Sequence, residues 1–265
     1  MRRILSLIAT LLLCAGIFCL GGIDLPHFKT ERALAQVPMT GAGLGAPSSG
    51  GGIPTFTAQT SGVNVSCGFV TTCSVTGLTV TSGFNIIGAL FSNQSGSNAS
   101  VSGITLCGTA LSLVSGSAAI AASGDYGGAA LFQGTVTGGT CTAVVTVSAA
   151  SAIQNVGVAL GLLSNLSSQI AGTACTVEFA GSAQGPYICG SSITIPTNGY
   201  GVCVFGLNAA TTLTSTNLTI SSQASGGSGV TLTAAGIGYT QTTETPQFGS
   251  SATFQNGSMS CAPWH

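Results

Sequence analysis

The sequence predicts an all-β protein whose main domain, residues 54–265, is a single antiparallel β-sandwich of jelly-roll-like or Ig-like type. Apolar residues alternate with small or polar ones in short runs, which is the period-two signature of strands. Clusters of Gly, Ser, Asn and Thr separate these runs at roughly 8–12 residues, a spacing typical of sandwiches. Evidence for helices is thin, because glycine totals 40 and the charged residues, which include good helix formers, make up 3% of the chain.

Residues 1–35 have the layout of a secretory signal peptide with an N-terminal signal helix. The chain starts with a short cationic segment, residues 4–23 carry no charge, and Ala33-Leu34-Ala35 is a small-x-small motif. We therefore expect cleavage after Ala35. The uncharged run is also long enough to span a bilayer as a helix, so an uncleaved membrane anchor through residues 4–23 is the alternative. Both interpretations place the rest of the chain outside the cytoplasm, in the periplasm, at the cell surface or in the extracellular space.

The remaining chain divides into a linker and a strand-rich region. Residues 36–53 are small, glycine-rich and contain proline, which indicates a flexible linker. Residues 84–91, FNIIGALF, form a continuous apolar run that predicts a strand buried on both faces. Residues 156–162 alternate between branched apolar residues and Gly or Ala, and residues 142–147 are rich in β-branched side chains, so both predict strands. Shorter alternating runs occur at residues 193–195, 218–220 and 230–232.

The clearest turn signal is an Asn-Gly pair between two of these runs. Residues 192–196 and 200–207 are strand-like, and Asn198-Gly199 lies between them, which predicts a β-hairpin. One stretch leaves an alternative open: the apolar residues of 160–170 also have helical spacing, so a turn or two of helix competes there with a strand followed by a loop. We favour the strand and the loop.

Eight cysteines follow the predicted cleavage site, and their even number in an exported chain indicates disulfides. They are Cys67, Cys73, Cys107, Cys141, Cys175, Cys189, Cys203 and Cys261. Eight cysteines allow many pairings, and the sequence does not choose among them. The pairs that we favour are two local ones, Cys67–Cys73 and Cys175–Cys189, and then Cys107–Cys141 and Cys203–Cys261. A metal site is not expected, because zinc sites use closely spaced ligands such as C-x2-C and no such pair occurs.

The charge inventory excludes several classes of function. No Lys or Arg follows Arg32, so phosphate neutralisation, and with it nucleic-acid binding, is not expected. The only histidine of this region is His265, the last residue, which is poorly placed to act as the base of a catalytic triad. The three carboxylates, Asp125, Glu178 and Glu244, are too far apart in the sequence to predict a catalytic pair or a calcium cluster. We therefore expect no enzyme activity, no catalytic residue and no cofactor.

Several segments together resemble a module of alphaproteobacterial phage and prophage proteins, which are mostly uncharacterised or tail- or particle-associated. The segments are VSGITLCGTALSLV (101–114), GGAALFQGTVTGGTCTAVVTVSA (127–149), VGVALGLL (156–163), SSITIPTNGYGVCVFGL (191–207) and GSMSCAPW (257–264). The resemblance is one of pattern and composition, and it implies a β-sandwich used as a structural or surface-binding module. The export signal and the eight cysteines depart from that family and favour a host-exported relative.

Two non-catalytic functions follow from these observations. The first is a structural or interaction protein of the cell surface or extracellular space that assembles with copies of itself, because an almost uncharged chain has little repulsion to keep copies apart. The second is a carbohydrate-binding or adhesion module that contacts a glycan through exposed aromatic rings, although core packing is the expected position of most of these rings. The candidate contact residues are Trp264, Tyr126, Tyr187, Tyr200 and Tyr239.

Overall fold

The computed structural model describes residues 55–93, 97–120, 128–150, 152–165, 174–183, 186–207, 213–215, 219–224, 229–235, 242–250 and 254–265. Over these residues the protein contains nineteen strands, arranged in antiparallel ladders, and no helix. The prediction of an all-β, antiparallel protein is therefore confirmed. The predicted signal segment, residues 1–35, and the predicted linker, residues 36–53, lie outside the described residues. The compact unit that contains all the described strands runs from Ser49 to His265.

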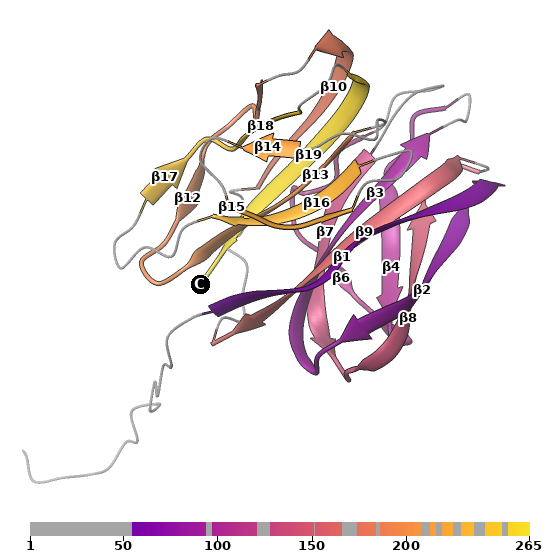
Figure 1. Ribbon diagram of the computed structural model, residues 1–265, viewed down its shortest axis with the longest axis horizontal. Helices are drawn as coiled ribbons and strands as arrows, with labels where there is room; N and C mark the ends of the chain where they lie inside the picture. Colours follow the sequence, from indigo (N-terminus) through magenta and orange to yellow (C-terminus); the bar gives the residue numbers. More distant parts are fainter. Residues whose placement is uncertain are drawn as a thin grey trace, which may run out of the picture. The chain divides into compact units, whose positions relative to one another are not determined.

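Three larger sheets and two small ladders make up the described part of the chain (Figure 1). The first sheet has the order β1 (Thr55–Val70), β9 (Ile153–Ser164), β3 (Gly83–Asn93), β7 (Gly128–Val136) and β6 (Ser112–Leu113). The second sheet has the order β2 (Thr72–Val80), β8 (Gly139–Val147), β4 (Val101–Leu106) and β5 (Thr109–Ala110). The third sheet has the order β10 (Cys175–Ala183), β19 (Phe254–Trp264), β13 (Tyr200–Leu207), β16 (Gly229–Ala235) and β15 (Thr219–Ala224). The small ladders are β11 (Tyr187–Ile188), β18 (Gln247–Ser250) and β14 (Leu213–Ser215), and β12 (Ile193–Ile195) with β17 (Thr242–Glu244).

A first hydrophobic core lies between the first and second sheets. Leu78 of β2 and Val145 of β8 pack into the same cluster as Phe132 of β7 and Leu160 of β9, and all four are at most 1% exposed. The second sheet contributes one face only: along β8 the side chains alternate between buried and half-buried from Ala143 to Val147. This alternation places the threonines of β8 on the outer face, as the period of two requires.

A second hydrophobic core lies on the opposite face of the first sheet and is shared with the third sheet. Leu131 and Leu163 of the first sheet join Val204 and Trp264 of the third in one buried cluster. A polar contact joins the third sheet to the β6–β7 connection, because Ser260 Oγ donates a hydrogen bond to the carbonyl oxygen of Ser117. The first sheet is thus covered on both faces.

Strand β3 shows why its sequence lacks alternation. Ile87 and Phe91 point into the first core, whereas Ile86 and Leu90 point into the second. Because successive side chains of a strand point to opposite faces, a strand between two cores needs apolar residues toward both. Asn85, the buried polar residue of this stretch, donates hydrogen bonds to the carbonyl oxygens of Thr81 and Gly83. The prediction that residues 84–91 form a strand buried on both faces is confirmed.

The predicted hairpin around Asn198-Gly199 is wrong, although both strands and the turn exist. β12 pairs with β17, and β13 pairs with β16 and β19, so the two runs do not pair with each other. The turn is closed by a bond from the Gly199 amide to the Pro196 carbonyl, 2.9 Å, and Asn198 takes a φ of 56°. Thr197 is not in the positive-φ region, whereas the type I′ turn of a tight hairpin needs positive φ at both central residues.

A glycine of β7 makes room for an aromatic ring of the first core. Gly128 is the cross-strand partner of Phe91, and a Cβ at Gly128 would overlap the Phe91 ring and lie 3.1 Å from the Ala119 carbonyl oxygen. We expect Gly128→Ala to lower the free energy of unfolding by about 1–3 kcal/mol through overpacking. The matched control is Gly103→Ala in β4, where the added methyl meets nothing within 4 Å. Urea unfolding of both variants tests this, and equal stabilities would contradict it.

Candidate functional site

The aromatic residues proposed as glycan contacts are largely core residues where the structure describes them. Trp264 has no exposed surface, and its indole Nε1 donates a 2.6 Å hydrogen bond to Gln133 Oε1. Tyr200 is also buried, with its ring centroid 6.3 Å from that of Phe56. Burial raises the pKa of the Tyr200 hydroxyl, and a hydrogen bond with the Phe56 backbone opposes this shift. Neither ring offers a face to a ligand.

The other three proposed contacts provide no aromatic platform in the described part of the chain. Tyr187 is half-buried in β11, where it pairs with Phe248 of β18. Tyr126 and Tyr239 lie outside the described residues. Core packing, which the sequence also favoured for most of these rings, is the position that the structure gives to Trp264 and Tyr200.

Three of the four expected disulfides are present. Cys67–Cys73 joins β1 to β2, Cys107–Cys141 joins the β4–β5 turn to β8, and Cys203–Cys261 joins neighbouring strands of the third sheet. Cys189 is also disulfide-bonded. The side chain of Cys175 lies outside the described ones, so the expected pair Cys175–Cys189 stays a prediction. Disulfides persist in oxidising compartments, and these three therefore indicate one.

The residues considered for catalysis or metal binding come together nowhere in the described part of the chain. Glu244 is half-buried in β17, Asp125 lies outside the described residues, and the side chain of Glu178 is not described. Among the residues that the structure describes, no three His, Cys, Asp or Glu side chains could hold one metal ion. In the same residues no helix has the length and apolar character needed to cross a membrane.

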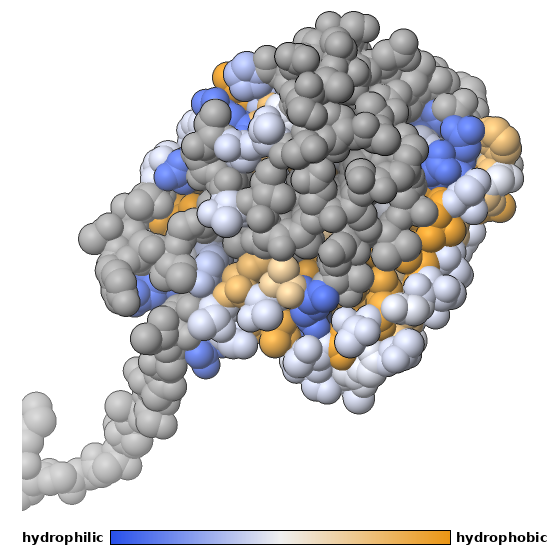
Figure 2. All heavy atoms as spheres, viewed as in Figure 1, coloured by the Kyte–Doolittle hydropathy of each residue, from blue (hydrophilic) through white to orange (hydrophobic). Residues whose placement is uncertain are grey.

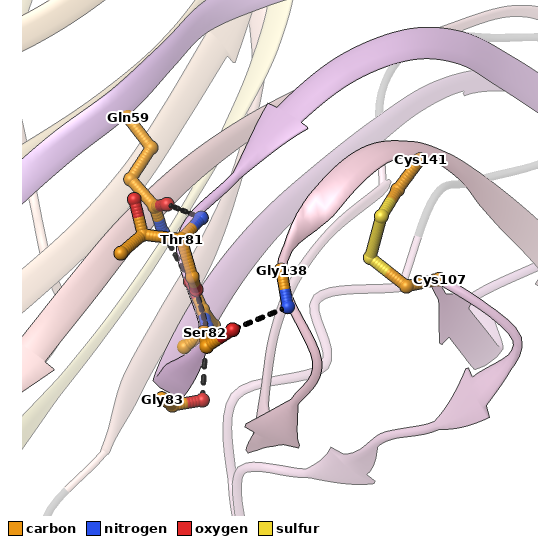
Figure 3. Close-up of a disulfide and its surroundings, with 8 residues drawn as sticks. Gln59, Thr81, Ser82, Gly83, Cys107, Gly138 and Cys141 are labelled. Atoms are coloured by element: carbon orange, nitrogen blue, oxygen red, sulfur yellow. Dashed lines mark hydrogen bonds between the residues drawn. A yellow bond between two sulfur atoms is a disulfide. The ribbon is translucent and has the colours of Figure 1, made fainter.

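A concave site lies at one end of the second sheet, beside the Cys107–Cys141 disulfide. Figure 3 shows this disulfide and its surroundings. We call it the depression; its volume is about 590 Å³. Its lining residues are Thr105, Cys107, Gly108, Thr137, Gly138, Gly139, Thr140, Cys141, Thr142 and Val144. None of them carries a charge, and the threonine hydroxyls are both donors and acceptors.

One wall of the depression is a tight hairpin turn. Cys107 and Gly108 connect β4 to β5, with Leu106 opposite Thr109, and both central residues have positive φ, 52° and 78°. This is the type I′ geometry, whose twist matches that of the flanking strands. The Cys107 amide also donates a 3.2 Å hydrogen bond to the Thr142 carbonyl oxygen. The turn is thus held to β8 by a hydrogen bond as well as by the disulfide.

The opposite wall is the connection from β7 to β8. The Gly138 amide donates a 2.7 Å hydrogen bond to Ser82 Oγ, as Figure 3 shows. A Cβ at Gly138 would lie 2.5 Å from the Ser82 amide nitrogen, so the close approach of the two backbones requires glycine. Next to Ser82, the Thr81 amide donates a hydrogen bond to Gln59 Oε1 of β1. These contacts fix the wall to the first and second sheets.

A second feature is the loop Cys67–Cys73, which a disulfide between its two end residues closes and which we call the stapled loop. Ser66 pairs with Asn155 and Val70 pairs with Ile153, so three residues of β1 stand opposite a single residue of β9. Phe69 lies in this bulge with 52% of its surface exposed and a φ of 64°. A bulky residue with positive φ is a true outlier, and such strain is concentrated at functional sites.

Sequence reasoning missed both features, although each has a signal in the chain. In Cys67-Gly-Phe-Val-Thr-Thr-Cys73 a short disulfide ring leaves an aromatic residue little room to reach a core. Residues 134–142, GTVTGGTCT, consist mostly of threonine and glycine and contain one cysteine. In Figure 2 pale spheres of near-neutral residues and orange spheres of hydrophobic ones lie side by side in the region of β2 and β8. The burial patterns of both strands place their threonines on the outer face.

The comparisons with known proteins return no relative. No protein-family model, no curated protein and no solved structure matches this chain.

Proposed function

We propose that the chain is an exported, non-catalytic structural or interaction protein of the cell surface or extracellular space, and that it associates with further copies of itself. The three disulfides support the export, because they need an oxidising compartment. In this proposal the signal segment, residues 1–35, directs export and is removed after Ala35.

The exposed and strained position of Phe69 is the observation that carries the proposal. A left-handed conformation costs an L-residue with a Cβ roughly 1–2 kcal/mol, and exposing a phenyl ring to water forgoes its burial. Buried aromatic anchors dominate protein interfaces. A disulfide that holds such a ring outward is therefore the arrangement of a contact residue and not of a core residue.

The rest of the chain carries little charge that would repel a second copy. No Lys or Arg follows Arg32, so repulsion between copies is weak. β2 is an edge strand of the second sheet. Lysine, which often prevents two edge strands from pairing, is absent from β2. A second copy of this chain is the partner that such a neutral surface accepts most readily.

The variant Phe69→Asn separates contact from folding. Asparagine tolerates the left-handed region, so the variant is expected to be more stable than the wild type by roughly 1 kcal/mol. It is also expected to lose self-association, because the apolar anchor is gone. Ile120→Asn, which removes another exposed apolar side chain, is the control and should leave association unchanged.

Sedimentation velocity at tens of micromolar protein, with disulfides intact, measures this association. We expect wild-type oligomers at both low and high salt, since screening has few charges to act on. A wild-type monomer under both conditions, or equal association of the wild type and Phe69→Asn, would overturn the proposal.

We also propose a finer fold class, a β-sandwich, and an origin of the protein from a phage particle component. The shared core of the first and second sheets supports a β-sandwich of jelly-roll-like or Ig-like type, to which the third sheet adds a further layer. The resemblance to phage and prophage modules, which rests on sequence pattern, supports descent from a structural or surface-binding particle component.

A further inference from the structure

We propose that the depression at the end of the second sheet binds a neutral carbohydrate, such as the end of an uncharged oligosaccharide. The proposal rests on the proposed function only in requiring an exported interaction protein, because such a protein meets glycans. It does not require self-association, and it uses none of the aromatic residues that the sequence suggested.

The hydrogen-bonding groups of the depression match a polyhydroxyl ligand. Four threonines contribute hydroxyl groups, and each hydroxyl can donate and accept, as sugar hydroxyls do. They are Thr105, Thr137, Thr140 and Thr142. Threonine is β-branched and therefore stiff at χ1, so little side-chain entropy is lost on binding.

Open space beside two glycines and a small apolar surface complete the site. At Gly108 and Gly139 an added Cβ would meet nothing within 4 Å, so both glycines border open space. Val144 and the Cys107–Cys141 disulfide supply apolar atoms against which the C–H groups of a sugar ring can pack. A volume of about 590 Å³ lies in the range typical of small-ligand sites, roughly 300–1,000 Å³.

The absence of charge from the lining selects the class of ligand. Phosphates and carboxylates are usually recognised by Arg or Lys, and none of the lining residues is basic. Long amide and acidic side chains are missing from the lining as well, so recognition depends on the short threonine hydroxyls. This chemistry favours a neutral glycan over a nucleotide, a sulfated or uronic-acid glycan, or a peptide with charged ends.

The walls of the depression are held in place before any ligand arrives. The disulfide joins the β4–β5 turn to β8, and Ser82 fixes the opposite turn through Gly138. A prearranged site loses little entropy on binding. The site is nevertheless open and without aromatic rings, so the affinity of one site should be low, and several sites in one assembly would strengthen attachment.

The test uses the mature, disulfide-intact protein and a panel of neutral gluco-, manno- and chito-oligosaccharides beside acidic ones, with binding followed by titration NMR. Thr142→Val removes one lining hydroxyl and keeps the β-branched shape. Thr146→Val is the matched control on the same face of β8, outside the depression. We expect the affinity for at least one neutral glycan to fall about fivefold or more in Thr142→Val and to stay unchanged in Thr146→Val.

Three results would overturn the proposal: no neutral oligosaccharide bound by the wild type, a preference for acidic glycans, or equal affinity of Thr142→Val and the wild type. Its failure can be told apart from failure of the proposed function. Thr142→Val should self-associate like the wild type, whereas Phe69→Asn should bind the glycan while remaining monomeric.

Discussion

Replacement of Trp264 by alanine is expected to lower the free energy of unfolding by about 3–5 kcal/mol. Trp264 is the largest fully buried side chain and lies in the core shared by the first and third sheets. Its loss would leave a cavity, and it would also leave Gln133 Oε1 without the indole donor. Guanidinium unfolding followed by far-UV circular dichroism measures the change.

Trp264→Phe is the matched variant, because it keeps an aromatic ring in the core and removes only the indole donor and part of the volume. We expect a smaller loss of about 1–3 kcal/mol. A loss below about 1 kcal/mol for Trp264→Ala would contradict the shared core, since removal of a fully buried aromatic side chain costs more than that.

The paired replacement Cys203→Ala with Cys261→Ala is expected to have an effect of similar size. In the chain-entropy account a disulfide stabilises by the loop it closes, and these cysteines are 58 residues apart. The expected loss of unfolding free energy is about 4 kcal/mol. For Cys67→Ala with Cys73→Ala, where the two cysteines are 6 residues apart, the expected loss is about 2 kcal/mol. Alanine is a suitable replacement because Cys203 and Cys261 are fully buried and alanine is small and apolar.

Thermal unfolding of the two double variants and of the wild type tests that order. The variant without Cys203–Cys261 should have the lowest melting temperature, and the one without Cys67–Cys73 should lie between it and the wild type. The reverse order would show that closure of the long loop is not the main contribution.

Sequence patterns predicted the strands well because the burial of each side chain in a strand depends on the face to which that residue points. The apolar run in β3 requires cores on both faces, and the β-branched alternation in β8 requires one buried and one outer face. Pairing between strands is a property of the whole chain, so it could not be predicted in the same way. Asn198-Gly199 correctly predicted a turn, but the φ at Thr197 and the competing partners β17, β16 and β19 decided against a hairpin.

The candidate site was predicted less well than the fold. Aromatic rings are the usual signal for a glycan platform, but an aromatic side chain stabilises a core just as readily, and Trp264 lies there. The depression instead depends on two turns far apart in the sequence, brought together by Cys107–Cys141 and by the bond from Gly138 to Ser82. Cys107–Cys141 was one of the favoured pairs among many that the sequence allows, but the hollow beside it follows only from the three-dimensional arrangement.

Fractionation of the native host, with mass spectrometry of the N-terminus and titration of free thiols, tests the central claim of an exported, disulfide-bonded interaction protein most directly. We predict that the protein is recovered outside the cytoplasm, that it begins at Gln36, and that the unfolded, unreduced chain has no free thiol. Recovery of the protein in the cytoplasm with four or more free thiols would contradict the claim.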